Sequence, residues 1–223
     1  MPSVLSVVMP VLNEAAIVRD ALERLQPLRM RGAELIVVDG GSADATPALA
    51  APLADRVVRA ARGRAAQMNA GAALARGDVL LFLHADSCLP ADADRLVAGH
   101  AWGRFDVRID SRSLALRLVA SMMNLRSRAT GIATGDQAIF ATADFFHQVG
   151  GFPEIALMED IAFSACARRL ARPACLRERV TTSARRWEKH GVLRTILLMW
   201  RLRLAYFMGA DPAELARRYA QQG

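Results

Sequence analysis

The pattern of hydrophobic and polar residues predicts strands that alternate with helices through the first half of the chain. Continuous apolar runs, typical of strands buried on both faces, are separated by stretches whose apolar residues recur at helical spacing. The expected strands are 5–11, 35–39, 55–59 and 79–83, and the expected helices are 14–25, 44–53 and 63–75. This half is therefore predicted to be an α/β unit with a parallel sheet covered on both faces.

The second half of the chain departs from this alternation. Apolar and charged residues alternate over 105–110, which is the pattern of a half-buried strand and predicts that the sheet becomes mixed. A further strand is expected at 137–141. Helices are expected at 92–100, 114–126, 143–149, 160–172, 189–208 and 211–221. Because no repeat, low-complexity segment or linker divides the 223 residues, a single domain is expected.

The composition is that of a globular protein from a reducing compartment. With 53% hydrophobic and 23% charged residues, the chain can bury a sizeable core and differs from disordered chains. Cys88, Cys166 and Cys175 are too few and too scattered for a disulfide framework or a zinc site. The first apolar stretch ends in Asn13-Glu14, which indicates a strand rather than a signal peptide. A cytoplasmic location is therefore expected.

The net charge of +7 is unevenly distributed along the chain. Residues 161–223 contain 13 basic and four acidic side chains, a net charge of +9, whereas residues 1–160 carry −2. A near-neutral first part without an RNA-binding motif argues against a nucleic-acid partner. The apolar segment 192–208 is interrupted by arginines, so it predicts an amphipathic helix, and membrane contact is a secondary alternative.

Polar residues follow three of the predicted parallel strands. Asn13 and Glu14 follow the first strand, Asp39 ends the second, and His84 and Asp86 follow the fourth. Ligands of open α/β sheets bind outside the carboxyl ends of the strands, so these are candidate binding residues. Each could alternatively cap or begin the next helix. The chain has no Gly-x-Gly-x-x-Gly loop after the first strand, no Walker loop and no Gly-x-Ser-x-Gly elbow, which argues against dinucleotide, P-loop and serine-hydrolase chemistry.

A set of short motifs occurs in a characteristic order. The segments are 8–14 (VMPVLNE), 37–44 (VVDGGSAD), 65–71 (AAQMNAG), 83–86 (LHAD), and 150–152 (GGF) followed by 158–160 (MED). Together they resemble the motifs of family 2 glycosyltransferases of the GT-A fold, over about residues 3–172. The resemblance implies a Rossmann-like, mixed and mostly parallel sheet with helices on both faces and a helical C-terminal extension. Within one domain, 1–223, it implies a nucleotide-binding half (1–100), an acceptor and catalytic half (101–172) and a basic helical extension (173–223).

The resemblance also implies a chemistry and a set of site residues. The donor would be a UDP-sugar, with inversion at the anomeric carbon and a divalent cation, Mg²⁺ or Mn²⁺, on the diphosphate. Asp160 would be the general base beside Glu159, and Asp86 would hold the cation, with His84 and His190 as further candidate ligands. The residues expected to bind the nucleotide sugar are Pro10, Asn13, Glu14, Asp39, Arg64, Asn69, His84, Ala85, Asp86, Gly135 and Asp136. A hard cation with oxygen ligands and a carboxylate base suit a diphosphate leaving group.

The chain departs from the family pattern at two carboxylates. Gly40 stands where the family usually has a second Asp, and His84 stands at the first position of the usual Asp-x-Asp motif. The basic C-terminal segment offers a second source of positive charge, because Arg binds phosphate through two parallel hydrogen bonds. The candidates for contact with the diphosphate or the acceptor are Arg185, Arg186, Trp187 and His190.

Within the family, the chain is similar to a small subgroup associated with selenium metabolism. That likeness implies selenosugar synthesis, in which a UDP-sugar such as UDP-GlcNAc and selenophosphate form a carbon–selenium bond. The alternatives are a polyprenyl-phosphate or other lipid acceptor at a membrane surface, another small-molecule acceptor, and an inactive sugar-nucleotide sensor. The Met-rich segment 121–124 is a candidate acceptor wall, dimer interface or core helix. The donor sugar, the acceptor, the metal and the oligomeric state stay open at this point.

Overall fold

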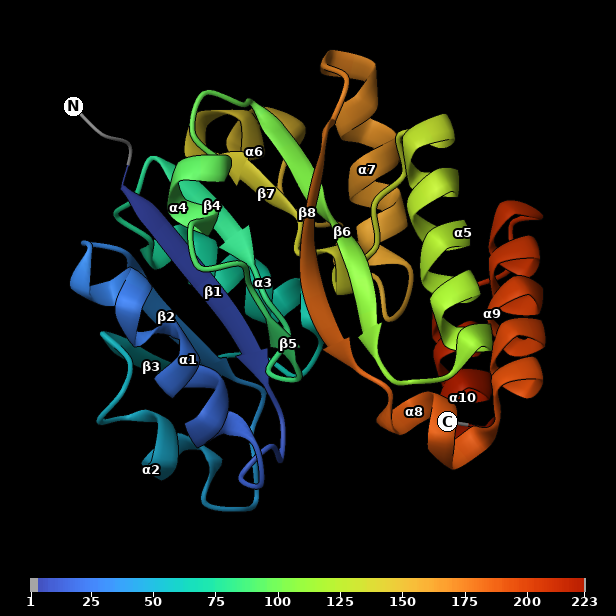
Figure 1. Ribbon diagram of the computed structural model, residues 1–223, viewed down its shortest axis with the longest axis horizontal. Helices are drawn as coiled ribbons and strands as arrows, with labels where there is room; N and C mark the ends of the chain where they lie inside the picture. Colours follow the sequence, from blue (N-terminus) through green and yellow to red (C-terminus); the bar gives the residue numbers. More distant parts are fainter. Residues whose placement is uncertain (1–3, 223) are drawn as a thin grey trace.

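A single mixed sheet organises the computed structural model, which describes residues 4–222 (Figure 1). The order of the strands across the sheet is β3-β2-β1-β4-β7-β6-β8-β5. Their bounds are Leu5–Val11 (β1), Glu34–Asp39 (β2), Arg56–Arg59 (β3), Val79–Phe82 (β4), Ser87–Cys88 (β5), Trp102–Asp110 (β6), Phe140–Thr142 (β7) and Ala174–Ser183 (β8).

Helices cover both faces of this sheet. Their bounds are Val18–Met30 (α1), Thr46–Ala50 (α2), Arg64–Leu74 (α3), Ala93–Leu96 (α4), Leu114–Thr130 (α5), Ala143–Val149 (α6), Glu159–Leu170 (α7), Arg185–His190 (α8), Val192–Phe207 (α9) and Pro212–Gln222 (α10). A 3₁₀ turn, η1, spans Gly135–Gln137. Within residues 4–222, no helix combines the length and the hydropathy that crossing a bilayer requires.

The strand directions confirm the expected mixed sheet. Strands β3, β2, β1 and β4 run parallel, as the alternation of strands and helices predicted. Strand β7 is antiparallel to both β4 and β6, β6 is parallel to β8, and β5 is antiparallel to β8. The carboxyl ends of β1, β2 and β4 therefore meet at one edge of the sheet, where the candidate binding residues were expected.

Two hydrophobic clusters fill the two sides of the sheet. Alternate residues of β1 belong to different clusters: Val7 and Met9 pack with helices α1 and α5, and Val8 packs with helices α3, α6 and α7. Successive side chains of a strand point to opposite faces, so a continuous apolar run is what burial on both faces requires.

Residues 174–183 correct the expectation of a purely helical C-terminal extension. They form β8, which lies inside the sheet between β6 and β5. Several side chains along β8 are exposed or half-buried and charged, so the segment lacks the apolar pattern by which the other strands were recognised. The expected helix 189–208 is also divided, because Gly191, with φ of 80°, separates α8 from α9. Glycine adopts this backbone conformation at little cost.

Candidate functional site

Hydrogen bonds join the loops that follow β1 and β2. Asn13 has a positive φ of 54°, and its side-chain Oδ1 accepts a 2.8 Å hydrogen bond from the backbone N–H of Ala43. The backbone N–H of Asn13 donates to Ser42 Oγ over 2.8 Å. The buried Asp39 carboxylate accepts from the backbone N–H groups of Gly41 and Ser42, each at 3.0 Å from Oδ2. Asn13 and Asp39, expected at one site, thus shape one pair of adjoining loops.

Glu14 links these loops electrostatically to the end of β4. Burial raises the pKa of Glu14, the negative charges of Asp86 and Asp44 raise it further, and Arg185 and His84 act in the opposite direction. These charges act on one carboxylate because the loops after β1 and β4 and the start of α8 converge there. The sequence-predicted residues Glu14, His84, Asp86 and Arg185 therefore belong to one charged region.

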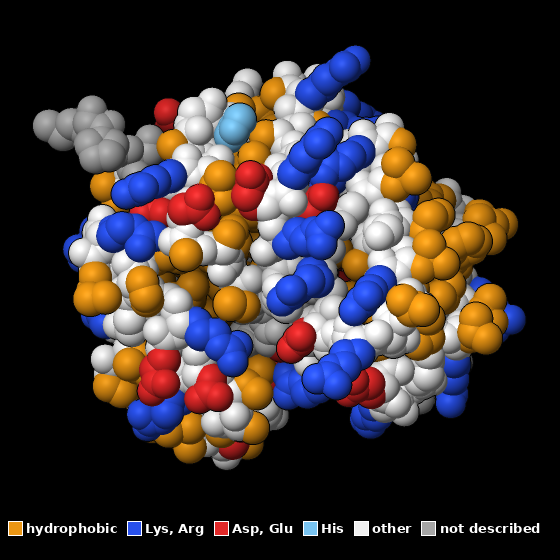
Figure 2. All heavy atoms as spheres, in the orientation of Figure 1, with side chains coloured by type: hydrophobic (Ala, Val, Ile, Leu, Met, Phe, Trp, Pro, Cys, Tyr) orange, Lys and Arg blue, Asp and Glu red, His pale blue; other side chains and the backbone are white. Residues whose placement is uncertain are grey.

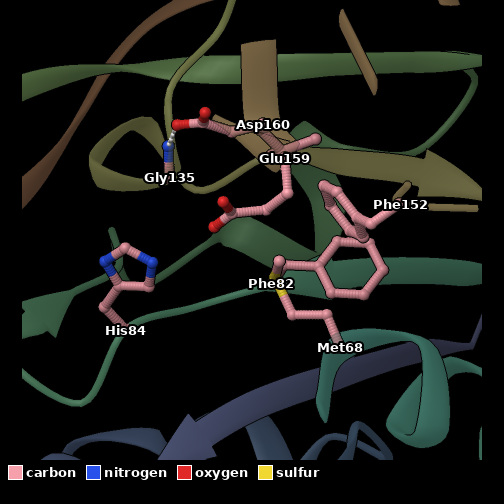
Figure 3. A pocket seen from close by; sticks show the side chains of 8 residues that line it. Met68, Phe82, His84, Gly135, Phe152, Glu159 and Asp160 are labelled. Carbon is pink, nitrogen blue, oxygen red and sulfur yellow. Dashed lines mark hydrogen bonds between the residues drawn. The ribbon is translucent and has the colours of Figure 1, made fainter. Parts of the chain in front are cut away.

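A pocket lies beside this region, between the end of β4, η1 and the start of α7 (Figure 3). Figure 3 shows the Glu159 carboxylate directed into the space between His84 and the apolar side chains, while the Asp160 carboxylate turns toward Gly135. The lining residues are Met68, Phe82, His84, Gly135, Ile139, Phe152, Glu159 and Asp160. The pocket thus has one apolar wall and two adjacent carboxylates.

The two carboxylates come from the first turn of α7. Asp160 Oδ2 accepts a 2.9 Å hydrogen bond from the backbone N–H of Gly135, and Oδ1 accepts a 2.7 Å bond from that of Ile161. Burial raises the pKa of Asp160, although these two hydrogen bonds and the charge of Arg64 lower it. Burial and the neighbouring Asp160 charge also raise the pKa of Glu159. A carboxylate with a raised pKa is a stronger base, as proton abstraction near neutral pH requires.

His84 is held against η1. Its Nδ1 lies 3.6 Å from Asp136 Oδ1, and a Cβ placed on Gly135 would lie 2.6 Å from His84 Cε1 and 2.7 Å from Nε2. Desolvation alone would raise the pKa of Asp136, but His84, Arg64 and Arg186 together hold it below its usual value. Glycine is thus required at position 135 because any side chain there would occupy the space in which the imidazole packs on the turn.

Because His84 packs against Gly135, substitutions at these two residues are expected to have coupled effects on the free energy of unfolding. Gly135→Ala is expected to reduce the free energy of unfolding by about 1–3 kcal/mol, because the added methyl group displaces the imidazole. In a His84→Ala background the same substitution should cost much less, since the ring is gone. Urea unfolding of the four proteins measures this coupling, and equal costs in both backgrounds would contradict it.

Arg64, the first residue of α3, faces the acidic groups of the pocket. Its side chain is exposed to solvent. Partial desolvation by the surrounding atoms lowers the pKa of Arg64, but the Tyr219 hydroxyl and the carboxylates of Glu159, Asp136 and Asp160 raise it overall. In return, the Arg64 charge lowers the pKa of both Glu159 and Asp160. Arg64 therefore favours the ionised form of the two carboxylates.

This pairing predicts a pH shift. If the ionised Asp160 is the base, activity falls as the pH drops through its pKa, and Arg64→Gln raises that pKa by removing a positive charge. The acid limb of kcat is therefore expected to move to higher pH. The measurement is kcat against pH at saturating donor, and Arg62→Gln, an exposed arginine outside α3, is the control. An unmoved limb would separate Arg64 from the titrating group.

The arginines after β8 occupy different environments. The Arg186 guanidinium carbon lies 3.9 Å from the centroid of the Tyr219 ring on α10, and Arg186 Nη1 donates to the Tyr219 hydroxyl. Arg185 is exposed, and its charge reaches Glu14. The Trp187 side chain packs against the hydrophobic cluster beneath α1 and α5. Desolvation and the charges of Lys189, Arg186 and Arg194 lower the pKa of His190.

Of the expected nucleotide-sugar residues, only His84 and Gly135 line the pocket itself, and the side chains of Asn69, Pro10 and Ala85 are held elsewhere. The Asn69 side chain pairs with the backbone of Phe152, its Nδ2 donating over 2.8 Å and its Oδ1 accepting over 2.9 Å. Pro10 is half-buried in β1, and Ala85 is buried in the turn after β4. The expectation that these and the other expected residues contact the ligand stays a prediction.

Three residues near the pocket were not expected from the sequence. Burial lowers the pKa of Arg126 on α5 while the charge of Asp160 raises it, and its Nε and Nη2 are buried without a hydrogen-bond partner among the described residues. Arg104 on β6 is fully buried, where it donates to Ser127 Oγ over 3.0 Å. Tyr219 approaches from the last helix. None of the three lies in a motif, and Arg104 and Arg126 belong to the part of the chain with a net charge of −2, so nothing in the sequence pointed to these two arginines.

Asp86 is the carboxylate expected to hold a divalent cation. Among residues 4–222, no group of three or more His, Cys, Asp or Glu side chains could hold a metal ion unaided. Asp86 is half-buried at the turn after β4, and its Oδ1 has only a long 3.4 Å contact with Ser87 Oγ. Magnesium sites on nucleotides often use one or two carboxylates and take their other ligands from phosphate and water. Asp86 therefore fits a cation that a diphosphate helps to coordinate.

The model of the family described as "Glycosyl transferase family 2" matches residues 6–114. These residues include β1 to β4, both loops joined by Asn13, and the His84-Ala85-Asp86 turn. The chain contains a family 2 glycosyltransferase domain. The family suggested by the motifs between residues 8 and 86 is thereby confirmed, whereas the motifs at 150–152 and 158–160 lie outside the matched residues. The mixed sheet with helices on both faces is the GT-A fold.

Solved structures of low sequence identity share the GT-A fold. A mannosyltransferase from Pyrobaculum calidifontis, in complex with GDP-Man and Mn²⁺, has a TM-score of 0.66 and 21% identity over 92% of this chain and 61% of its own. S. aureus TarS 1–349 in complex with UDP has a TM-score of 0.65 and 18% identity over 81% of this chain and 60% of its own. Glucosyl-3-phosphoglycerate synthase from Mycobacterium tuberculosis, with Mn²⁺, UDP and phosphoglyceric acid, has a TM-score of 0.59 and 19% identity over 81% and 69%.

The chain is shorter than the first of these structures. It spans about three fifths of the mannosyltransferase and of TarS 1–349. No curated protein matches the chain. The family model and the solved structures thus identify a family 2 glycosyltransferase domain with the GT-A fold. The substrates are inferred from the residues of the site.

Proposed function

We propose that the protein is an inverting glycosyltransferase that uses a UDP-sugar and a divalent cation. The observation that carries this proposal is the convergence of a pocket with two carboxylates on the turn that holds His84 and Asp86. The related folds bound to GDP-Man or UDP together with Mn²⁺ support a nucleotide-sugar donor. Donor and acceptor would meet where the strand-end loops face the start of α7.

The loops after β1 and β2 would hold the nucleoside. Their backbone is fixed by Asn13 and by the Asp39 carboxylate, which accepts from the backbone N–H groups of Gly41 and Ser42 and from the Ser42 hydroxyl. Asp39 would accept from the base in exchange for its hydrogen bond with the Ser42 hydroxyl. Asp86 would hold Mg²⁺ or Mn²⁺, with His84 as a neighbouring candidate ligand. When bound, the cation would neutralise the charge that develops on the leaving diphosphate. Arg185 and Arg186 would contribute further positive charge on the same side.

Asp160 would receive the proton of the acceptor. Its raised pKa suits this role, and the hydrogen bonds from Gly135 and Ile161 fix the orientation of the carboxylate. The acceptor would attack the anomeric carbon from the face opposite the diphosphate as the bond to the diphosphate oxygen breaks, which inverts the configuration. Glu159 faces the same space and would bind the acceptor or the sugar hydroxyls.

The preferred specific activity is selenosugar synthesis from UDP-GlcNAc and selenophosphate. It rests on the arginine-rich surroundings, because an anionic acceptor needs positive charge beyond that used by the donor. Selenium in such an acceptor is already ionised near neutral pH. Asp160 would then orient the acceptor rather than remove its proton.

Product identification tests the proposal. The protein would be incubated with UDP-GlcNAc and Mn²⁺ together with selenophosphate, phosphate or simple alcohols, and the products identified by mass spectrometry. A selenium-linked sugar supports the selenosugar synthase activity. A glycosylated alcohol in the absence of any selenium-linked sugar overturns selenophosphate as the acceptor but supports the glycosyltransferase activity. UDP binding without product from any UDP- or GDP-sugar and acceptor would indicate a sensor and overturn the enzyme assignment.

A further inference from the structure

Two helices carry an uncovered apolar stripe. On α9 the exposed fractions include 69% for Trp200 and 70% for Phe207, and on α5 they include 76% for Leu114. Figure 2 shows hydrophobic side chains gathered at the right-hand edge of the molecule, over α5 and α9. The exposed apolar residues of the two helices are Leu114, Leu118, Met122, Leu125, Leu193, Leu197, Trp200, Leu204 and Phe207, with Met208 directly after α9.

The two stripes belong to one face of the molecule. Figure 1 shows α5 and α9 along the same edge, and Figure 2 shows their apolar side chains there together. The inner side chains Val119 and Met123 of α5 and Val192 of α9 pack against the same hydrophobic cluster. Their outer residues recur at spacings of three and four, so each stripe lies on the side opposite the packed one. We call this surface the α5–α9 face.

The charges on the two helices are all of one sign. Neither α5 nor α9 contains an acidic residue, and their six arginines are Arg117, Arg126, Arg128, Arg194, Arg201 and Arg203. At about 100° per residue, Arg194 and Arg201 border one side of the α9 stripe and Arg203 borders the other. Arg117, Arg194 and Arg201 are exposed. An apolar stripe between arginines matches a partner that is apolar inside and anionic at its surface.

The charge pattern disfavours a second copy of this chain as the occupant. A symmetric dimer through the α5–α9 face would bring the same arginines of both copies together, without acidic partners on either helix. An anionic bilayer instead accepts the apolar side chains at the level of its headgroups and pairs the flanking arginines with lipid phosphates. Trp and Phe are favoured at that interface.

We propose that the α5–α9 face docks the protein on the surface of an anionic lipid bilayer. The helices lie in the plane of the membrane and do not cross it, as their length and arginine content require. Helix α9 follows α8 directly and packs with α10, which carry Arg186 and Tyr219. The docked surface therefore adjoins the candidate site. This inference concerns a binding surface and does not depend on the proposed transferase activity.

Vesicle sedimentation tests the docking directly. The full chain would be mixed with vesicles of phosphatidylcholine alone or of equal parts phosphatidylcholine and phosphatidylglycerol, and the partition coefficient measured. We expect at least about tenfold stronger partition to the anionic vesicles, and a marked loss at about 1 M salt, where charges are screened within about 3 Å. Equal and negligible partition to both kinds of vesicle would overturn the proposal.

Matched variants assign the binding to the face. The triple variant Leu197→Gln, Trp200→Gln and Leu204→Gln changes only exposed side chains, so it should fold and should lose at least about tenfold of the partition. Met30→Gln, on α1 and 80% exposed, is the control and should bind like the unchanged protein. Unchanged binding by the triple variant would overturn the assignment.

Trp200 provides an independent signal. Trp102 is buried and Trp187 packs against the core, so the exposed Trp200 should dominate any change in indole emission on docking. A blue shift with anionic vesicles that disappears in Trp200→Phe supports insertion at the interface. An emission spectrum that does not change with vesicles, or a concentration-dependent dimer abolished by the triple variant without vesicle binding, would overturn it.

Discussion

With an alcohol acceptor, whose proton must be removed, Asp160→Asn is expected to lower kcat by about 10²–10⁴-fold, which is the usual contribution of a general base. UDP binding should change little, because the carboxylate points at Gly135 rather than at the strand-end loops. The amide keeps one of the two backbone hydrogen bonds and removes a buried charge whose pKa is raised. The expected change in unfolding free energy is therefore within about 1–2 kcal/mol. Steady-state kinetics, UDP titration and urea unfolding measure the three effects.

Two further variants make the Asp160 prediction specific. Glu159→Gln should lower kcat less than Asp160→Asn, because Glu159 is assigned to substrate contact rather than to proton removal. Asp144→Asn, an exposed aspartate of α6, should leave kcat unchanged. If Glu159→Gln is the more damaging change, the base is Glu159. If neither matters, proton removal is no part of the rate-limiting chemistry, as an ionised selenium acceptor would allow.

Asp86→Ala is expected to lower activity by at least about a thousandfold. The reason is that stabilising the diphosphate through a cation supplies several kcal/mol, and each factor of ten corresponds to about 1.4 kcal/mol. Calorimetric titration provides a readout besides turnover: Mn²⁺ should tighten UDP binding to the unchanged protein and should not do so with Asp86→Ala. Excess chelator should imitate the substitution.

The control for Asp86 is a carboxylate of the same chain without a role at the site. Asp92 is exposed in the segment before α4, and Asp92→Ala should retain both activity and the effect of Mn²⁺ on UDP binding. Full turnover in excess chelator would show that the reaction does not require a divalent cation. In that case the positive charge would have to come from Arg185 and Arg186.

Most of the first half of the fold could be predicted because its information is local. The strands β1, β2 and β4 are apolar along their whole length, so burial on both faces is readable directly from the sequence. Strand β8 could not be recognised in this way. It joins the sheet through backbone hydrogen bonds to β6, while its exposed charged side chains follow no apolar alternation. Pairing between segments some seventy residues apart leaves no periodic signal.

The part of the candidate site that lies at the ends of the parallel strands could be predicted from the sequence. Parallel strands bring their carboxyl ends together, so the sequence alone is enough to group Asn13, Asp39 and Asp86. The pairing of Arg186 with Tyr219 could not be predicted, because it depends on how α10 folds back after α9. The position of Gly135 against His84 likewise depends on a 3₁₀ turn that residue preferences do not indicate.

Because β8 is part of the sheet, it fixes the spacing between the two site elements that flank it in the chain. Its upstream neighbour is α7 with Asp160, and its downstream neighbour is α8 with Arg185. Residues 179–183 at the end of β8 pair without interruption with β6, and Thr181 and Thr182 also pair with β5, so strand register fixes the position of the chain just before Arg185. Deleting one residue from the regularly paired stretch 179–183 would draw the start of α8 back by about 3.3 Å and reverse the faces of the residues that follow the deletion. Substitutions on the exposed face of β8 are thus tolerable, while changes in its length are not.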